Sequence, residues 1–271
     1  MEHSARRLRR FYFQDNLPLE SQTFCLSAGE SKHLAQILRL KPGDSCLVLD
    51  SAGIEVHARV ESFRADGRVD LLVLKRYQPT ATFWPIRIYQ AIPKGVKFET
   101  LIQKAQEIGV SALIPLMTER TVVRIEQKKE SPKMVRWHKI AAEAAKQSGC
   151  RTALEISVPM TLTEAFRSLG AKSLVAILHP SASSIPLRLW ADHLSDKSKE
   201  APLPALNLFI GPEGGFSSRE ISAAEEAAAR ESWDFQQLGL GASILKTDTA
   251  FIGVAAFLKF WMEGLLTEAN R

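Results

Sequence analysis

Two glycine-bearing turns near the end of the chain hold the residues best suited to chemistry. The first is Leu208-Phe-Ile-Gly-Pro-Glu-Gly-Gly-Phe-Ser-Ser-Arg-Glu220. It is typical of a strand end, a glycine loop and a helix start capped by Ser217 or Ser218 with Glu220 in its first turn. α/β folds bind ligands at the carboxyl ends of parallel strands, and glycines let a ligand approach the backbone. A tight turn without a ligand explains the same residues. Neither GxGxxG nor GxxxxGKS/T is present, which argues against a phosphate-binding P-loop.

The second turn is Leu238-Gly-Leu-Gly-Ala-Ser-Ile-Leu-Lys-Thr-Asp-Thr-Ala250. Thr247 or Asp248 is a candidate N-cap for the helix that follows. Alternatively, Lys246 beside Asp248 is a polar pair placed against a ligand. Together the two turns offer backbone amides and carbonyls next to apolar side chains, which suits a flat adenine without phosphate contacts, and therefore S-adenosylmethionine better than ATP.

The elements that position these turns alternate between strand and helix from residue 84 onward. Apolar strands are expected at 86–92, 112–115, 174–178 and 206–210, and helices at 96–108, 133–147 and 218–229. The last helix, from about 248 to 263, is apolar on nearly every side, so it must be buried centrally or at a subunit interface. This pattern predicts an α/β domain with a parallel sheet. The polar stretch 192–204 is expected to be a loop.

The first 78 residues have a different texture. Alternating or β-branched patterns predict short strands at 45–50, 54–60 and 68–74. One helix is expected over 29–39, with Leu34, Ile37 and Leu38 on its inner face. Short strands with tight turns and one helix favour a small β-barrel. The stretch 78–85, with two prolines, separates an N-terminal domain (1–78) from a second domain (84–271).

The chain has 271 residues and a formal charge of +5, and that charge is unevenly distributed. Residues 81–160 hold 13 basic and 7 acidic side chains, whereas residues 161–271 hold 10 basic and 13 acidic ones. The distribution indicates a basic face on one region, as a nucleic-acid-binding protein needs.

Several classes of protein are disfavoured. The three cysteines (Cys25, Cys46 and Cys150) have neither metal-ligand nor CxxC spacing, and the six histidines form no HExxH motif, so no metal site is expected. The most apolar stretch, Thr249 to Leu258, is about half the length of a membrane span. We expect a cytoplasmic protein.

A family resemblance adds to these observations. GPEGGF at 211–216, followed by LG at 238–239 and ILKTDTA at 244–250, resembles the C-terminal signature of RsmE-type SPOUT methyltransferases, the bacterial 16S rRNA uridine-N3 methyltransferases. RRF at 9–11, ILRLKPGD at 37–44, EIGV at 107–110 and EAAKQS at 143–148 match the same family in order.

The resemblance implies a fold and an activity. The fold is an N-terminal PUA-like RNA-binding β-barrel followed by a SPOUT α/β domain with a deep trefoil knot. The activity is methylation of N3 of one uridine in 16S rRNA (family position m3U1498) from S-adenosyl-L-methionine, by a homodimer acting on the rRNA or on the small ribosomal subunit.

The same resemblance maps the cofactor pocket onto three loops. Where the family usually has Arg-Thr-Glu-Thr-Ala, this chain has Lys246-Thr-Asp-Thr-Ala250, so the charges are kept, but Lys lacks the guanidinium fork and Asp is one methylene shorter. The expected cofactor-binding residues are Leu178, His179, Pro180, Ile210, Gly211, Pro212, Glu213, Gly214, Leu238, Gly239, Ser243, Ile244 and Leu245.

The chemistry assigns roles to a few residues. N3 of uridine carries a proton at neutral pH, so transfer needs that proton removed and the uracil oxygens stabilised. Lys246 with Arg10 or Arg9 is expected to stabilise the negative charge. Asp248 or Glu213 would orient these groups or accept the proton, and the sequence does not choose between them.

The residues expected to bind RNA are basic side chains of the N-terminal domain and the middle of the chain. They are Arg9, Arg10, Arg39, Arg120, Arg124, Arg136 and Arg151. Two other functions remain open: an RNA-binding ribosome assembly factor with little or no turnover, and a SPOUT enzyme that modifies another rRNA nucleotide.

Overall fold

The structure is a computed structural model that forms two compact units, Met1–Ala81 with Ala145–Ala153, and Thr82–Ala144 with Leu154–Arg271. Within them it describes residues 9–13, 17, 21–49, 54–77, 84–95, 97–121, 131–148, 154–181, 183–197 and 205–269.

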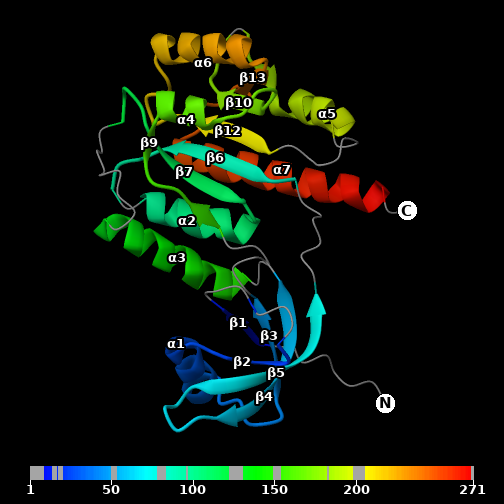
Figure 1. Cartoon of the computed structure of the whole chain (residues 1–271). Coiled ribbons are helices and arrows are strands. Elements are labelled where there is room, and N and C mark those ends of the chain that lie inside the picture. The colour runs from blue at the N-terminus through cyan, green and yellow to red at the C-terminus, as the bar shows by residue number, and fades with distance from the viewer. Residues whose placement is uncertain are drawn as a thin grey trace. The chain divides into compact units, whose positions relative to one another are not determined.

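The N-terminal unit is built on a five-stranded sheet in the order β1-β3-β4-β5-β2 (Figure 1). The strands are β1 (Arg9–Tyr12), β2 (Thr23–Cys25), β3 (Ser45–Leu49), β4 (Glu55–Phe63) and β5 (Val69–Tyr77). β1 runs parallel to β3, and the other pairs are antiparallel. Alternate residues such as Val56, Ala58 and Val60 are buried, which is why this part of the sequence alternates. The three predicted strands are confirmed, whereas β1 and β2 were not predicted.

The predicted helix of this unit is real but changes its winding part-way. α1 (Ala28–Lys32) begins after Ser27, whose side chain accepts a hydrogen bond from Glu30 N, and continues as a π-helical turn η1 (His33–Ile37). Leu34 is fully buried as expected, but Ile37 is 70% exposed, so its predicted inward position is wrong. The Leu38 N–H bonds to the His33 carbonyl five residues earlier, and this wider turn rotates Ile37 off the inner face.

The C-terminal unit contains a parallel sheet in the order β11-β13-β10-β12-β6-β7-β8, with β9 paired to β7. Its strands are β6 (Ile86–Ala91), β7 (Ala112–Met117), β8 (Glu155–Ile156), β9 (Met160–Thr161), β10 (Leu174–Leu178), β11 (Ile185–Pro186), β12 (Leu206–Ile210) and β13 (Asp234–Gly239). The four predicted strands are β6, β7, β10 and β12, which form the centre of this sheet.

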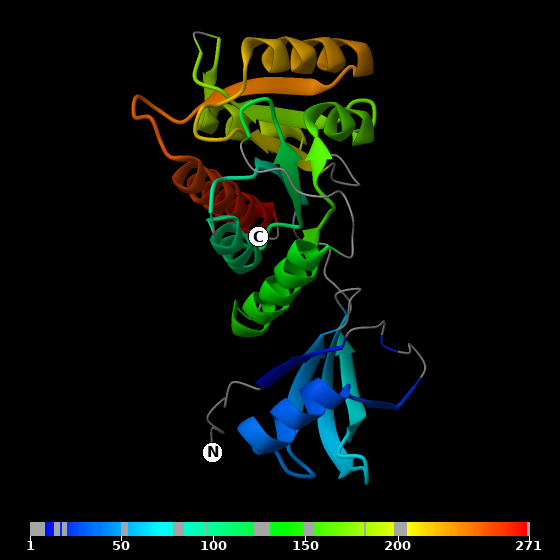
Figure 2. The same ribbon diagram turned by 90° about the vertical axis from the view of Figure 1, so that its left-hand side faces the viewer.

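Helices cover both faces of this sheet. One face packs against α2 (Lys97–Ile108), α3 (Pro132–Ser148), α5 (Leu187–Lys197) and α7 (Thr247–Ala269). The other packs against α4 (Leu162–Ser168) and α6 (Ser218–Glu231). Figure 2 shows the red α7 and the orange α6 on opposite sides of the strands.

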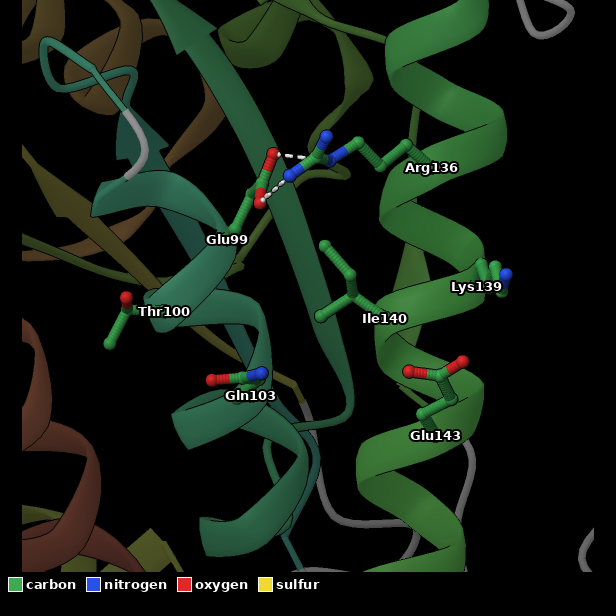
Figure 3. A pocket seen from close by; sticks show the side chains of 7 residues that line it. All are labelled: Glu99, Thr100, Gln103, Arg136, Lys139, Ile140 and Glu143. Atoms are coloured by element: carbon green, nitrogen blue, oxygen red, sulfur yellow. Dashed lines mark hydrogen bonds and ion pairs between the residues drawn. The ribbon is translucent and has the colours of Figure 1, made fainter.

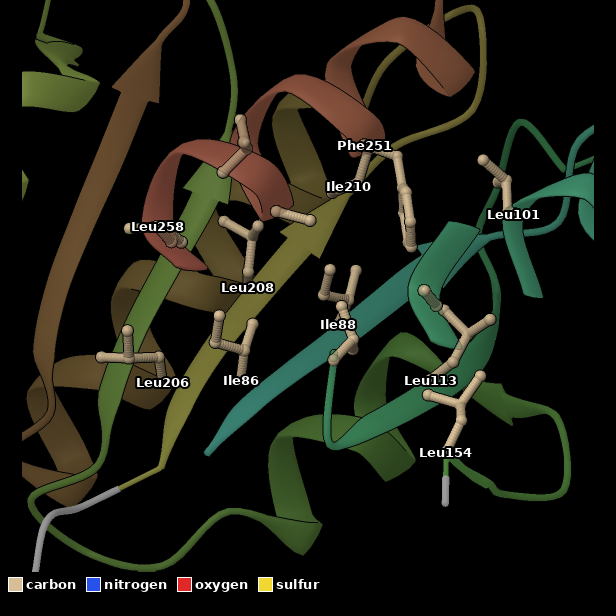
Figure 4. Close-up of a cluster of buried hydrophobic side chains, with 14 of the residues drawn as sticks. Ile86, Ile88, Leu101, Leu113, Leu154, Leu206, Leu208, Ile210, Phe251 and Leu258 are labelled. Atoms are coloured by element: carbon tan, nitrogen blue, oxygen red, sulfur yellow. The ribbon is translucent and has the colours of Figure 1, made fainter. Parts of the chain in front are cut away.

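The core explains why the central strands are mainly apolar. Ile86 and Ile88 of β6 and Leu208 of β12 face Phe251 of α7 (Figure 4). The intervening Tyr89 and Phe209 face the other layer, where their rings stack with centroids 4.3 Å apart. Because both faces are covered, a buried residue of these strands must be apolar or hydrogen-bonded.

Two expectations from the sequence need correction. The stretch 192–204 is not a loop throughout, because α5 continues to Lys197. Trp190, Ala191 and Leu194 of this helix are buried on one side, and the exposed side is mainly polar. Residues 198–204 lie outside the described part. α7 is not buried centrally either, since Phe251, Val254 and Leu258 face the core while Ile252 and Phe260 are exposed. Among the described helices, none has the length and apolar character to cross a membrane.

Candidate functional site

The carboxyl ends of four parallel strands meet at one edge of the C-terminal sheet. Leu178 of β10 pairs in register with Ile210 of β12 on one side and with Leu238 of β13 on the other. Ile210 in turn pairs with Gln90 of β6. The His179 N–H donates to the Leu238 carbonyl at 3.1 Å. The starting points of the three predicted cofactor loops are therefore neighbours at this edge.

The loop Gly211–Gly215 is shaped by its own backbone. The Gly215 N–H donates to the Pro212 carbonyl at 2.8 Å, and Gly215 has a φ of +66°, in the left-handed region that favours glycine. A Cβ on Gly211 would lie 3.1 Å from the Gly215 backbone, tighter than nearly all Cβ contacts, so the loop would have to shift to accept one. Ser217 rather than Ser218 then caps α6, because its side chain accepts from Glu220 N and Glu220 bonds back to Ser217 N.

The turn after β7 is fastened to this loop. The Glu119 N–H donates to Glu220 Oε1 at 2.8 Å. Arg120 Nη1 donates to the Gly214 carbonyl, and the Arg120 side chain lies against Gly214. Arg120, predicted to bind RNA, is therefore exposed beside the glycine loop. Only a capping role was predicted for Glu220, whereas its second contact, with Glu119, joins residues far apart in the chain.

The connection from β10 to β11 closes the other side. A Cβ on Gly239 would lie 3.0 Å from Ser184 Oγ, so these two segments are in close contact. Ser181 Oγ donates to Gln237 Oε1 at 2.9 Å. His179 is partly exposed and Pro180 is exposed. Neither serine was singled out from the sequence.

The start of α7 differs from the expected cap. The Lys246 carbonyl accepts the first helical hydrogen bond, from Ala250 N at 2.9 Å, so Lys246 occupies the N-cap position and Thr247 is the first helical residue. The prediction of Thr247 or Asp248 as N-cap is wrong, because the Thr247 hydroxyl instead donates to the Gly211 carbonyl at 2.8 Å. Asp248 lies in the first turn, where the helix dipole favours a negative charge.

The segment before α7 is exposed over its whole length. Ile244 is 98% exposed and Leu245 is 39% exposed, while Ser243 and Lys246 are also exposed. Two apolar side chains in water next to the glycine loops are poorly placed unless another molecule covers them.

Glu213 has a cationic neighbour. Its Oε1 lies 4.0 Å from Lys97 Nζ, and both side chains are a little under half exposed. Lys97 is the first residue of α2, which follows β6, the strand next to β12. No motif marked Lys97 in the sequence, and only the parallel register of β6 and β12 brings the two residues together.

The other residues predicted to bind RNA fall in different settings. Arg136 forms a bidentate pair with Glu99, with both nitrogen–oxygen distances at 2.7 Å, and this hydrogen-bonded carboxylate raises the pKa of Arg136. Arg39 is exposed in the N-terminal unit, in a left-handed backbone conformation. Arg9 and Arg10 lie on β1 of that unit, and Arg124 and Arg151 are outside the described residues.

A surface hollow of about 450 Å³ lies between α2 and α3 (Figure 3). The Glu99–Arg136 pair spans it, and none of its lining residues belongs to the glycine loops. The lining consists of Glu99, Thr100, Gln103, Arg136, Lys139, Ile140 and Glu143. Its two acidic and two basic side chains balance, so it has no preference for an anion or a cation. Within the described ranges, no group of His, Cys, Asp and Glu side chains has a metal-binding arrangement.

Comparison with known proteins defines the family. Residues 80–259 match a family model described as an RNA methyltransferase domain, and residues 26–70 match an RNA methyltransferase PUA domain. The chain is 32% identical over 229 residues to the ribosomal RNA small subunit methyltransferase E of Synechocystis sp., with 84% of this chain and 70% of the relative covered. The chain belongs to the methyltransferase E family. The relative of the same name from Bacillus subtilis is 30% identical over 239 residues, with 85% of this chain and 87% of the relative covered.

A solved member of the methyltransferase E family has the same fold. The crystal structure of the enzyme from Neisseria gonorrhoeae, bound to S-adenosyl methionine, is 26% identical, with a TM-score of 0.73 and coverage of 93% of this chain and 96% of that chain. The predicted family, the PUA-like N-terminal domain and the parallel-sheet methyltransferase domain are therefore confirmed.

Proposed function

We propose that this chain transfers a methyl group from S-adenosyl-L-methionine to N3 of one uridine of 16S rRNA, in the cytoplasm. The observation that carries the proposal is the meeting of the loops after β6, β10, β12 and β13 with the Lys246–Asp248 segment at one edge of the sheet. The family membership supplies the reaction class.

The loops fit an S-adenosyl-L-methionine molecule. Leu178, Ile210 and Leu238 supply an apolar floor, and the turns that follow them supply backbone amides and carbonyls. Exposed Ile244 and Leu245 would be covered by a bound adenosine or by a second subunit. The bound cofactor supplies an electrophilic methyl group on a sulfonium, and the chain must then bring N3 of uridine in line with it.

The residues at this edge suit the activation of uridine. Lys246 is exposed at the mouth of α7, where its ammonium can stabilise negative charge on a uracil oxygen. Arg10, on β1 of the N-terminal unit, is a second candidate for this role on the family resemblance alone. Asp248, in the first turn of α7, and Glu213, beside Lys97, are the two carboxylates available to accept the N3 proton or orient the cations.

RNA binding is assigned to the N-terminal domain (1–78) and to the basic middle of the chain, and catalysis to 84–271. Exposed Arg39 and Arg120 are the best-supported individual contacts to phosphate. Arg120 is of particular interest because its side chain donates a hydrogen bond to Gly214 of the glycine loop.

The sheet order supports a threaded C-terminal segment, the trefoil knot of the SPOUT fold. β10 and β11 are consecutive strands, yet β13 lies between them in the sheet. The connection from β10 to β11 therefore crosses the end of β13, where the chain leaves toward α7. A trefoil knot requires that one segment pass beneath another in this way: here the segment from β13 to α7 would pass beneath the connection from β10 to β11.

The exposed side of α7 supports a homodimer. Ile252, Ala256 and Phe260 recur every four residues along this side, and Ile252 and Phe260 are 36% and 67% exposed. A second copy of the chain would cover them, and also Ile244 and Leu245, which would place the partner next to the cofactor loops.

The test is methyl transfer from tritiated S-adenosyl-L-methionine to small subunits and naked 16S rRNA from a strain that lacks the gene. Mass spectrometry then maps the product. We expect label on N3 of a single uridine. Cofactor and RNA binding without label would instead identify an assembly factor, and label on another base would identify a different rRNA target.

A further inference from the structure

Near the carboxyl end of β6, the side-chain amide of Gln90 is buried among apolar residues. Gln90 is 0% exposed and is flanked along the strand by the buried Tyr89 and Ala91. A side-chain amide in such surroundings is costly unless its polar atoms are hydrogen-bonded. Its partners therefore show why glutamine occupies the position.

The amide is the first member of a relay that reaches the glycine loop. Gln90 Nε2 donates to the Ala91 carbonyl at 2.7 Å and to Thr247 Oγ1 at 3.0 Å. Thr247 Oγ1 donates to the Gly211 carbonyl at 2.8 Å. A hydroxyl has a single proton, and the Gly211 carbonyl can only accept, so the hydroxyl must accept from Gln90. The chemistry of the three partners thus fixes the direction of the whole relay.

The relay joins three segments that the reaction needs in register. Gly211 begins the glycine loop, Thr247 lies between Lys246 and Asp248, and Gln90 belongs to the strand beside β12. We propose that Gln90 and Thr247 are positioning residues that hold Lys246 and Asp248 at a fixed place relative to the cofactor loop. This inference rests on the proposed function of that edge, but it concerns residues that touch neither cofactor nor uridine.

The alternative is that Gln90 only stabilises the sheet and has no role in positioning. Asn207, a second buried amide of the same sheet, allows the two possibilities to be compared. Asn207 of β12 is 3% exposed, and its Nδ2 donates to the carbonyls of Leu174 and Ala205 at 3.1 Å. It lies near the amino end of its strand, whereas Gln90 lies near the carboxyl end of the neighbouring one. Gln90 Oε1 and Asn207 Oδ1 are both buried without a hydrogen-bond partner among the described residues. The two amides therefore have a similar free-energy cost of burial.

The experiment compares full-length variants of similar shape: Q90M, T247V, T247S and N207L. Each is measured for thermal unfolding, for affinity toward S-adenosylhomocysteine by calorimetry, and for single-turnover methyl transfer at saturating cofactor. We expect Q90M and T247V to lose about tenfold to a hundredfold in single-turnover rate and severalfold in affinity, because small misplacements of reacting groups have effects of this size. T247S, which keeps the hydroxyl, should restore the rate, and N207L should lower only the unfolding temperature.

Each other result counts against one specific claim. A T247V rate within about twofold of wild type, or an equal rate loss in N207L and Q90M, overturns the relay as a positioning device. If the wild-type chain transfers no methyl group, the proposed function fails. In that case a loss of affinity in T247V but not in N207L still supports anchoring of the loop, and equal affinities overturn it.

Discussion

The carboxylate of Glu220 accepts a hydrogen bond of 2.8 Å from the backbone N–H of Glu119, which lies 101 residues earlier in the chain. The same carboxylate accepts from Ser217 N at 2.8 Å, so one buried side chain both caps α6 and ties the turn after β7 to the glycine loop. Two N–H donors converge on two oxygens, and only a carboxylate offers an acceptor to each.

The first prediction concerns this carboxylate. E220Q should lower the free energy of unfolding by about 1–3 kcal/mol, because the new amide nitrogen must face one of the two N–H donors. The control is E164Q in the exposed capping box of α4, where Glu164 meets Thr161. That change should have a cost of about 1 kcal/mol or less. Urea unfolding measures both, and calorimetry with S-adenosylhomocysteine should show weaker binding for E220Q only. Equal effects of the two variants on binding would contradict a link to the loop.

The second prediction concerns the turn within the loop. G211A should destabilise the protein by about 1–3 kcal/mol and weaken cofactor binding, because its Cβ would lie 3.1 Å from the Gly215 backbone, which has little room to move. G170A is the matched control in the same unit, since a Cβ there has no heavy atom within 4 Å. Thermal unfolding and calorimetry check both variants, and a G211A protein that binds like wild type would rule out the loop as a cofactor site.

Some strands of the C-terminal sheet could be predicted from the sequence and others could not. The central strands were predictable because Leu174–Leu178 and Leu206–Ile210 are covered on both faces and are apolar at every position except Asn207, whose side-chain amide is hydrogen-bonded. β13 was not predictable, because most of its residues are only half-buried and several are polar. Asp234 bonds to His193 and Gln237 bonds to Glu225 through their side chains. A polar strand of this kind has no periodic signal.

In the candidate site too, some features could be predicted from the sequence and others could not. The glycine loops could be predicted because a left-handed φ and a close backbone contact demand glycine at Gly215 and Gly211. The contacts of Lys97 with Glu213 and of Gln90 with Thr247 could not, because they depend on which strands are neighbours in a parallel sheet. A glutamine at the end of the apolar strand 86–91 was the available signal, since a buried amide needs partners.

The third prediction concerns Cys46 in the N-terminal unit. Burial raises the pKa of this thiol from 9.0 to about 12, so only about one molecule in ten thousand carries the reactive thiolate at pH 8. In a C25S/C150S variant, Ellman's reagent should therefore label Cys46 only as the unit unfolds. Because the folded pKa is the higher one, the thiol's contribution to stability is complete below pH 9 and is lost between about pH 9 and 12. Labelling of the native protein at the rate of free cysteine would contradict this burial.

The fourth prediction concerns RNA binding by exposed arginines. If Arg39 contacts a phosphate, R39A should weaken binding to 16S rRNA and reduce the slope of log affinity against log salt by about 1, because one fewer counterion is released. R68A changes the net charge equally, but Arg68 Nε is already paired with Asp66 at 2.7 Å, so its slope should stay at the wild-type value. Filter binding over a range of salt concentrations measures both. An unchanged slope in R39A would remove Arg39 from the interface.

The fifth prediction concerns the pair at the start of α7. K246A and D248N should each lower single-turnover methyl transfer, by about a hundredfold to a thousandfold if the residue stabilises the developing charge directly. K246A should leave folding unaffected, because Lys246 is exposed and its carbonyl, which caps the helix, survives the substitution. D248N should lower the free energy of unfolding by at most about 1 kcal/mol, because it removes one favourable charge from the first turn of α7. K246R introduces the arginine that the family resemblance predicts at this position and should retain the rate. K104A, which removes a lysine paired with Glu107, is the control and should leave the rate unchanged.

A pH profile of the rate separates the two roles. Loss of a proton acceptor in D248N changes the shape of the profile, whereas loss of an electrostatic contact in K246A lowers the rate uniformly near neutral pH. Full activity in both variants would exclude the pair from catalysis and leave Glu213 as the remaining carboxylate at this edge.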